Sequence, residues 1–99
     1  MPTLVFAKFA INDHIGYSRY VELATPIFLR EKVIIHASDE EPQALSLDMQ
    51  ADKVVLLEFR DHSHFKHFFS QADYIEAAKI RDAASTISAT VFERFEMPK

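Results

Sequence analysis

Residues 51–60, Ala-Asp-Lys-Val-Val-Leu-Leu-Glu-Phe-Arg, are the stretch of sequence that decides the fold. Their apolar and β-branched run is typical of a strand, and the polar segment 61–63 predicts where that strand stops. Side chains alternate between the two faces of a sheet, and here both sets are apolar: Val55, Leu57 and Phe59 on one side, Val54 and Leu56 on the other. We therefore predict a strand in the middle of a sheet.

The segments on either side of this strand alternate between strand and helix patterns. The predicted strands cover 3–11, 33–38 and 86–95, and the predicted helices cover 14–30, 64–70 and 74–85, with a weak hairpin extension at 44–48. Asp13 is expected to cap the first helix, and Pro26 to kink or loosen it before Arg30. Ser70 and Asp73 have the spacing of a capping box for the last helix.

This order of elements predicts an α+β, ferredoxin-like βαββαβ domain over residues 1–99. A four-stranded antiparallel sheet would carry both helical arms on one face. The other face would hold Leu4 and Phe6 beside Val54 and Leu56, and apolar side chains of this kind should not face water. We therefore expect a homodimer in which two sheets pack face to face.

The composition excludes several classes of function. The chain has 99 residues, 48% of them apolar, a net charge of −4, one glycine and no cysteine. No basic tract is present to neutralise phosphates, so nucleic acid is not an expected partner, and no cysteine chemistry is available. Apolar runs fall far short of the ~20 residues that cross a bilayer, and the N-terminus shows no secretory signal, so we expect a cytoplasmic protein. Glycine-rich phosphate loops are excluded, and no cofactor is expected.

Several short motifs are distributed over most of the chain: a strand ending in Glu-Phe, an aromatic pair, a turn before a Tyr, a helical Arg and, in the first half, an Asp, spaced Tyr residues and a helical Pro. In this sequence they are Glu58-Phe59, Phe68-Phe69, residues 70–74, Arg81, Asp13, Tyr17, Tyr20 and Pro26. In these motifs the chain resembles a family called domain of unknown function 1330.

Two positions depart from that family: Arg30-Glu31-Lys32 stands where a Gly-Gly pair is usual, and Ala72 stands where Pro is common. The family is similar to the dimeric α+β barrels, a set that includes small monooxygenases, isomerases of lactone pathways and proteins of no known activity. The resemblance thus implies a ferredoxin-like fold and a dimer, and it barely constrains the chemistry.

The first candidate site lies on the sheet face away from the helices. Alternation places Lys8, His36 and Glu58 there, with Ser88 and Thr90 from the last strand. A histidine beside a carboxylate and an ammonium in apolar surroundings is suited to general base catalysis, with His36 and Glu58 as catalytic residues and Lys8 as a ligand-binding residue. The alternatives are a satisfied polar cluster and an ion pair in the dimer interface.

A second set of candidates lies on the helices. The Arg81 guanidinium is suited to binding a substrate carboxylate, or else it pairs with an acid such as Asp13 or Glu58. Tyr17 and Tyr20 share the apolar stripe of the first helix, where tyrosines are usually core residues. Tyr20 is the one that we take as a candidate ligand-binding residue.

Three histidines, His62, His64 and His67, invite a comparison with metal sites because His64 and His67 share one helical face. The spacing fixes no further ligand, and these residues begin a solvated helix, so no metal site is predicted.

Two functional hypotheses remain. In the first, the chain is a cofactor-independent enzyme, or a binder, for a compact aromatic or acidic molecule held between the sheet and the helices. In the second, it is a non-catalytic homodimeric module whose apolar sheet face serves only for assembly. A cavity of a few hundred Å³ with Lys8, His36 and Glu58 inside favours the first hypothesis, and a filled barrel favours the second.

Overall fold

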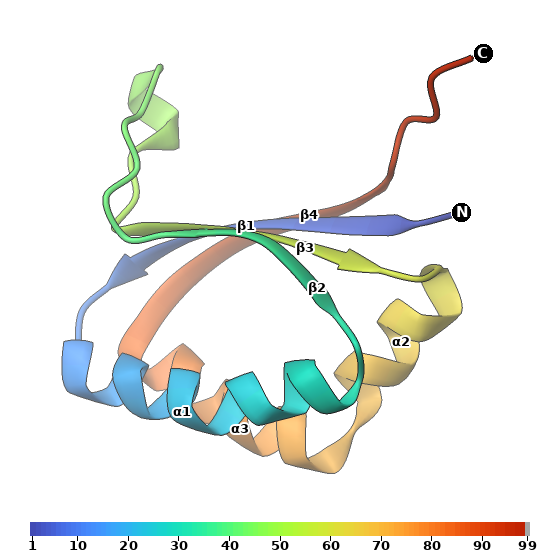
Figure 1. Ribbon diagram of the computed structural model, residues 1–99. Helices are drawn as coiled ribbons and strands as arrows, with labels where there is room; N and C mark the ends of the chain where they lie inside the picture. The colour runs from blue at the N-terminus through green and yellow to red at the C-terminus, as the bar shows by residue number, and fades with distance from the viewer. Residues whose placement is uncertain (99) are drawn as a thin grey trace.

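The architecture is one antiparallel sheet with all three α-helices on a single face, as the computed structural model of residues 1–98 describes it (Figure 1). The strands are β1 (Thr3–Ile11), β2 (Ile34–Asp39), β3 (Lys53–Phe59) and β4 (Ser85–Glu93). The helices are α1 (His14–Arg30), α2 (His62–Ser70), α3 (Ala72–Ala84) and the 3-10 turn η1 (Leu47–Met49). The sheet order is β2-β3-β1-β4, with every neighbouring pair antiparallel. This confirms the predicted ferredoxin-like fold and the central place of β3.

The sheet face that meets the helices forms the core. Antiparallel register pairs Val5 with Leu57 and Ala7 with Val55, so that these side chains point together toward the helices. Phe59 is fully buried, and its ring packs against the ring of Phe68 at a centroid distance of 5.6 Å. Burying a phenylalanine completely contributes about 1.5–3 kcal/mol, which fixes the helical layer to the sheet.

The opposite sheet face, which we call the bare face, has no helix over it (Figure 1). Phe6 pairs with Leu56 on one side and with Thr90 on the other, and all three side chains point away from the helices. Phe6 and Leu56 are only half-buried. The apolar bare face predicted from the sequence is therefore present.

Most boundaries lie within two residues of the sequence predictions, and the main differences are local. Residues 44–48 form no strand, and the 3-10 turn η1 lies there instead, within an exposed loop. Helix α2 begins two residues early, because the Asp61 carboxylate accepts a hydrogen bond from the His64 backbone N–H at 2.8 Å and caps the helix. The predicted capping box does not form, because the Ser70 hydroxyl donates to the His67 carbonyl instead.

The first helix has the predicted bounds, His14–Arg30. Asp13 caps it by accepting from the Gly16 N–H at 3.0 Å. The helix then continues through Pro26 to Arg30, and a reverse turn follows in which Lys32 has a φ of 59°. A left-handed residue suits glycine, so the loop keeps a glycine-like backbone although the sequence has lysine. Within the described residues, no helix is both long and apolar enough to span a membrane.

Candidate functional site

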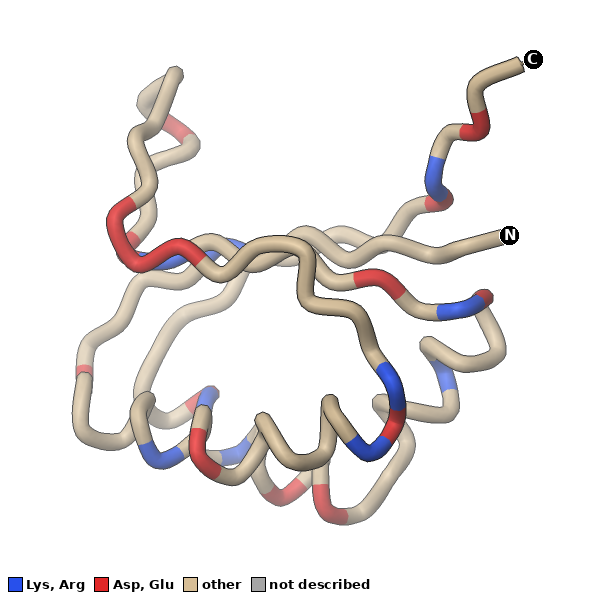
Figure 2. Tube along the Cα trace, in the orientation of Figure 1, with Lys and Arg blue, Asp and Glu red and all other residues tan. Residues whose placement is uncertain are grey.

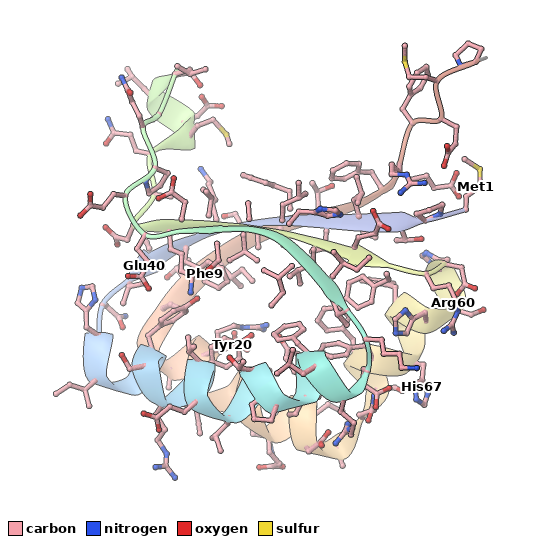
Figure 3. The ribbon with its side chains drawn as sticks, in the orientation of Figure 1. Met1, Phe9, Tyr20, Glu40, Arg60 and His67 are labelled. Atoms are coloured by element: carbon pink, nitrogen blue, oxygen red, sulfur yellow. The ribbon has the colours of Figure 1, made fainter. Side chains whose placement is uncertain are left out.

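A cavity of about 440 Å³ lies between the helix-facing side of the sheet and the helices. Its volume is in the range of small-molecule sites. Most of the lining is aliphatic or aromatic and comes from all four strands and all three α-helices. Figure 3 shows Phe9 from β1 and Tyr20 from α1 pointing toward one another across this space. Only a few side chains of the lining carry polar groups, and their hydrogen bonds and charges determine what the cavity can bind.

Three polar side chains of the cavity lining are joined by hydrogen bonds that connect α3 with α1. Arg81 Nη1 donates to the Tyr74 hydroxyl at 3.0 Å, and the hydroxyls of Tyr74 and Tyr20 lie 2.8 Å apart. The bond between the tyrosines uses one of their two hydroxyl protons, and the other has no acceptor among the described residues. This chain of Arg81, Tyr74 and Tyr20, which we call the Arg81 relay, can therefore still donate a hydrogen bond to a ligand.

The Arg81 guanidinium is largely enclosed, with its side chain 15% exposed. It pairs with neighbouring Asp82, its Nη2 lying 3.1 Å from the carboxylate, and it lies 5.9 Å from the Tyr20 ring centroid. Arg81 therefore does pair with an acid, but that acid is Asp82 and not Asp13 or Glu58, the two named as examples in the sequence prediction. An arginine has five N–H donors, more than these contacts use, so that donors remain for a carboxylate or phenolate.

The other cationic group in the lining is Lys53, which the sequence analysis did not select. Its residue is only 6% exposed because it pairs with Phe9 on the helix-facing side of the sheet. The Nζ atom lies 4.8 Å from the Tyr17 ring centroid, and no carboxylate among residues 1–98 is within salt-bridge distance. Burial lowers the pKa of Lys53, and the negative charge of Glu40 opposes that shift.

Tyr17 and Tyr20 remain protonated at neutral pH. Burial raises the pKa of Tyr17 to about 12, and burial together with the nearby Tyr74 raises the pKa of Tyr20 further. The rings of Tyr17 and Tyr20 have centroids 5.6 Å apart and form one wall, with Lys53 over the first ring and Arg81 over the second. The wall therefore carries two cations and neutral hydroxyl donors in apolar surroundings.

The predicted pair His36 and Glu58 does form, on the bare face and outside the cavity lining. His36 Nε2 donates to Glu58 Oε1 at 3.0 Å, and this bond lowers the pKa of Glu58, with help from the charge of Arg94. A bulge between Ile35 and Ala37 leaves His36 as the extra residue of β2 and directs its ring to Glu58. Their predicted catalytic role stays a prediction, and this position suits the interface alternative.

Lys8 lies on the bare face, as predicted, but not beside that pair. It is opposite Val54 and Ser88, whereas Glu58 is opposite Leu4, four residues or ~13 Å away along β1. Its ammonium donates to the backbone carbonyl of Asp48. The cation that accompanies Glu58 is Arg94, with Nη1 at 3.3 Å from Oε1.

The histidines of α2 serve the backbone. The His64 Nδ1 accepts from the Arg60 N–H at 3.0 Å, so that Nε2 carries the proton and donates to the Glu31 carbonyl at 2.7 Å. His62 packs against Phe65, and His67 lies 3.7 Å from the Glu31 carboxylate. The three imidazole rings therefore have different partners and do not point to a common centre. Among the described residues, no group of three or more His, Cys, Asp or Glu side chains is arranged to hold a metal ion.

Solved structures share the fold at low sequence identity. A protein of unknown function from Rhodopseudomonas palustris matches with a TM-score of 0.83 and 17% identity, over 97% of this chain and 84% of that one. SnoaB, a cofactor-independent oxygenase from Streptomyces nogalater, matches with a TM-score of 0.68 and 14% identity, over 97% and 95%. A dimeric protein of unknown function with a ferredoxin-like fold from Bacteroides fragilis matches with a TM-score of 0.65 and 11% identity, over 94% and 96%.

At these identities the likeness concerns the fold alone. No curated protein matches the sequence. The model of one family matches residues 2–95, which is nearly the whole chain. The chain therefore belongs to the family described as domain of unknown function (DUF1330), as the sequence resemblance predicted.

Proposed function

We propose that this protein binds a compact, partly aromatic acid in the cavity between its sheet and helices. The observation that carries the proposal is the Arg81 relay, a mostly enclosed guanidinium joined to two tyrosine hydroxyls in an otherwise apolar cavity of about 440 Å³. An aromatic ring would fill the apolar part, and a carboxylate or phenolate would accept hydrogen bonds from the relay. Lys53 adds a second positive charge to the same lining.

The charge distribution along the chain supports an anionic ligand. Figure 2 shows acidic residues clustered on the loop after β2, and further charged residues of both signs along the helices. The charged residues that line the cavity, in contrast, are Lys53 and Arg81, both cationic. Arg81 is paired with Asp82, but Lys53 has no carboxylate among the described residues within salt-bridge distance. A buried cation without an anion is costly, so that an acidic ligand would relieve that cost.

The direct test is binding of benzoate compared with its neutral analogue benzyl alcohol, measured by ligand-observed NMR and thermal shift. The wild type should bind benzoate more tightly, and Arg81→Met should weaken benzoate binding at least tenfold, since a charged hydrogen bond contributes about 1.5–3 kcal/mol. Arg19→Met is the matched control, because Arg19 is exposed on the same helix as Tyr20. Equal binding of both probes, or of benzoate by wild type and Arg81→Met, would contradict the proposal.

Turnover is the second part of this proposal. The structural neighbour SnoaB is a cofactor-independent oxygenase, and it supports testing the same class of reaction here. Oxygen consumption should be measured with phenolic acids that bind, without any added cofactor. Consumption by the wild type and none by Arg81→Met would identify an oxygenase, whereas binding without consumption would exclude oxygenase activity on those acids.

We also propose that the chain forms a homodimer through its bare face. The half-buried apolar side chains of that face support this, and so does the dimeric state of the Bacteroides fragilis neighbour. The loop before β3 and the C-terminal segment both rise on this side of the sheet (Figure 1). They carry almost fully exposed apolar residues, Leu45 and Leu47 on the loop and Phe95 and Met97 on the segment. A second copy would cover these side chains, and the His36–Glu58 pair would lie within the interface.

A further inference from the structure

We propose that Lys53 forms a Schiff base with an aldehyde or ketone carried by the ligand of this cavity. The inference rests on the proposed function, because it requires the cavity to bind an organic acid. It assigns Lys53 as a nucleophile and narrows the ligand class to oxo acids, which carry a carbonyl group and an acidic group in one compact molecule.

The position of Lys53 is the first argument. A lysine on a strand usually extends to solvent, but here the side chain turns into the apolar cavity, and the residue is 6% exposed. The neighbours at its sheet position are Phe9 on β1 and, beyond it, Ile87 on β4, both apolar. Tyr17 on α1 presents its ring to Nζ at 4.8 Å, and none of the ion pairs among residues 1–98 includes Lys53.

The second argument concerns the charge state that the reaction needs. Only the neutral amine is nucleophilic, and an exposed lysine is neutral in roughly one molecule in a thousand at pH 7. Burial lowers the pKa of Lys53, whereas the negative charge of Glu40, directly after β2, raises it, and the first effect is larger. Figure 3 shows Glu40 at the same end of the space between sheet and helices as Phe9.

The chemistry balances without a further reactant. The Nζ lone pair attacks the carbonyl carbon, and the resulting carbinolamine loses one water that contains the carbonyl oxygen and both amine protons, so that a C=N bond replaces the C=O bond. The acidic group of the same molecule would bind the Arg81 relay, which shares with Lys53 the wall formed by Tyr17 and Tyr20. Holding both groups together makes the condensation effectively intramolecular.

The test is reductive trapping with 4-formylbenzoate and cyanoborohydride at neutral pH, followed by mass spectrometry of the intact protein and of its peptides. The expected product gains the mass of the probe less one oxygen atom, and most of the label should lie on Lys53. Benzoate should slow the labelling by competition. Lys53→Met and Lys53→Arg should both lose it, and Lys79→Met should keep it, because Lys79 is exposed and pairs with Glu76.

Labelling spread over the lysines in proportion to their exposure would overturn the inference. So would an unlabelled Lys53 in a protein that still binds benzoate, and in that case the proposed function stands and Lys53 acts only as a charge. If benzoate does not bind and Lys53 is not labelled, both proposals fail together. The two readouts therefore separate failure of the nucleophile from failure of the binding site.

Discussion

Replacing Lys53 with methionine should make the unliganded protein more stable. Methionine has a similar length and keeps the apolar contacts with Phe9 and Tyr17, but it carries no charge that burial must desolvate. Replacing buried ionic groups by apolar ones often stabilises a protein by about 1–4 kcal/mol. Loss of the contact between Nζ and the Tyr17 ring offsets about 0.5–1 kcal/mol of that gain. We therefore expect a net gain of about 1 kcal/mol in the free energy of unfolding.

The gain should depend on pH in a defined direction. The pKa of Lys53 is lower in the folded protein than in the unfolded chain, so the unfolded chain binds the proton more tightly. The destabilisation of the wild type is fully present below the folded pKa, and it is lost as pH rises to the unfolded value of about 10.4. The advantage of Lys53→Met should consequently be larger near neutral pH than at about pH 10.

Urea unfolding followed by far-UV circular dichroism measures both effects, at one protomer concentration because a dimer makes stability concentration-dependent. Lys79→Met is the control: it changes the net charge equally, and its exposed ion pair should contribute less than about 1 kcal/mol at either pH. A Lys53→Met protein that is less stable than the wild type at neutral pH would refute the reasoning. A gain of the same size at both pH values would also refute it, because the ammonium would not be its cause.

Three further substitutions test other parts of the structure. Tyr74→Phe removes the hydroxyl that bonds to both Tyr20 and Arg81, and it should lower the free energy of unfolding, measured in urea, by about 1–3 kcal/mol. An unchanged urea midpoint of unfolding would contradict this, because it would mean that water replaces the lost bonds. Leu56→Asp puts a charge on the bare face and should halve the mass measured by light scattering, and a wild type that is already monomeric at micromolar concentration would contradict the proposed dimer. Lys32→Gly should raise the unfolding free energy by about 0.5–1 kcal/mol, because glycine adopts the φ of 59° without strain, and a loss of stability would count against that explanation.

The fold could be predicted from the sequence because it depends on local features, namely the alternation of apolar residues in strands and the capping residues of helices. Alternation in residues 3–11 and 51–60 predicted both faces of the two central strands, and the Asp13 cap marked the start of α1. One prediction failed because of a competing local bond. Ser70 donates to a backbone carbonyl within α2 instead of capping α3. A serine hydroxyl can bond to several nearby backbone groups, and the sequence does not show which of them it chooses.

The candidate site was predicted in part. Tyr20 and Arg81 were selected and line the cavity, whereas Lys53 and Arg94 were missed. Both lie on the alternation that was used for their neighbours: Lys53 continues the series Val55, Leu57, and Arg94 follows β4. Each of these charged residues occupies a position of the two-residue alternation. A search for apolar residues at those positions passes over a charged one.

By itself, the sequence determined the order of the elements, the two apolar faces of the sheet and the family to which the chain belongs. Only the tertiary structure decided which face borders a cavity, and which charges meet there. Lys8, His36 and Glu58 share one face, but their separation depends on register and on the bulge at His36. The meeting of Arg81 with Tyr74 and Tyr20 depends on the packing of α3 against α1, because residues far apart in the chain become neighbours only when buried area holds the two helices together.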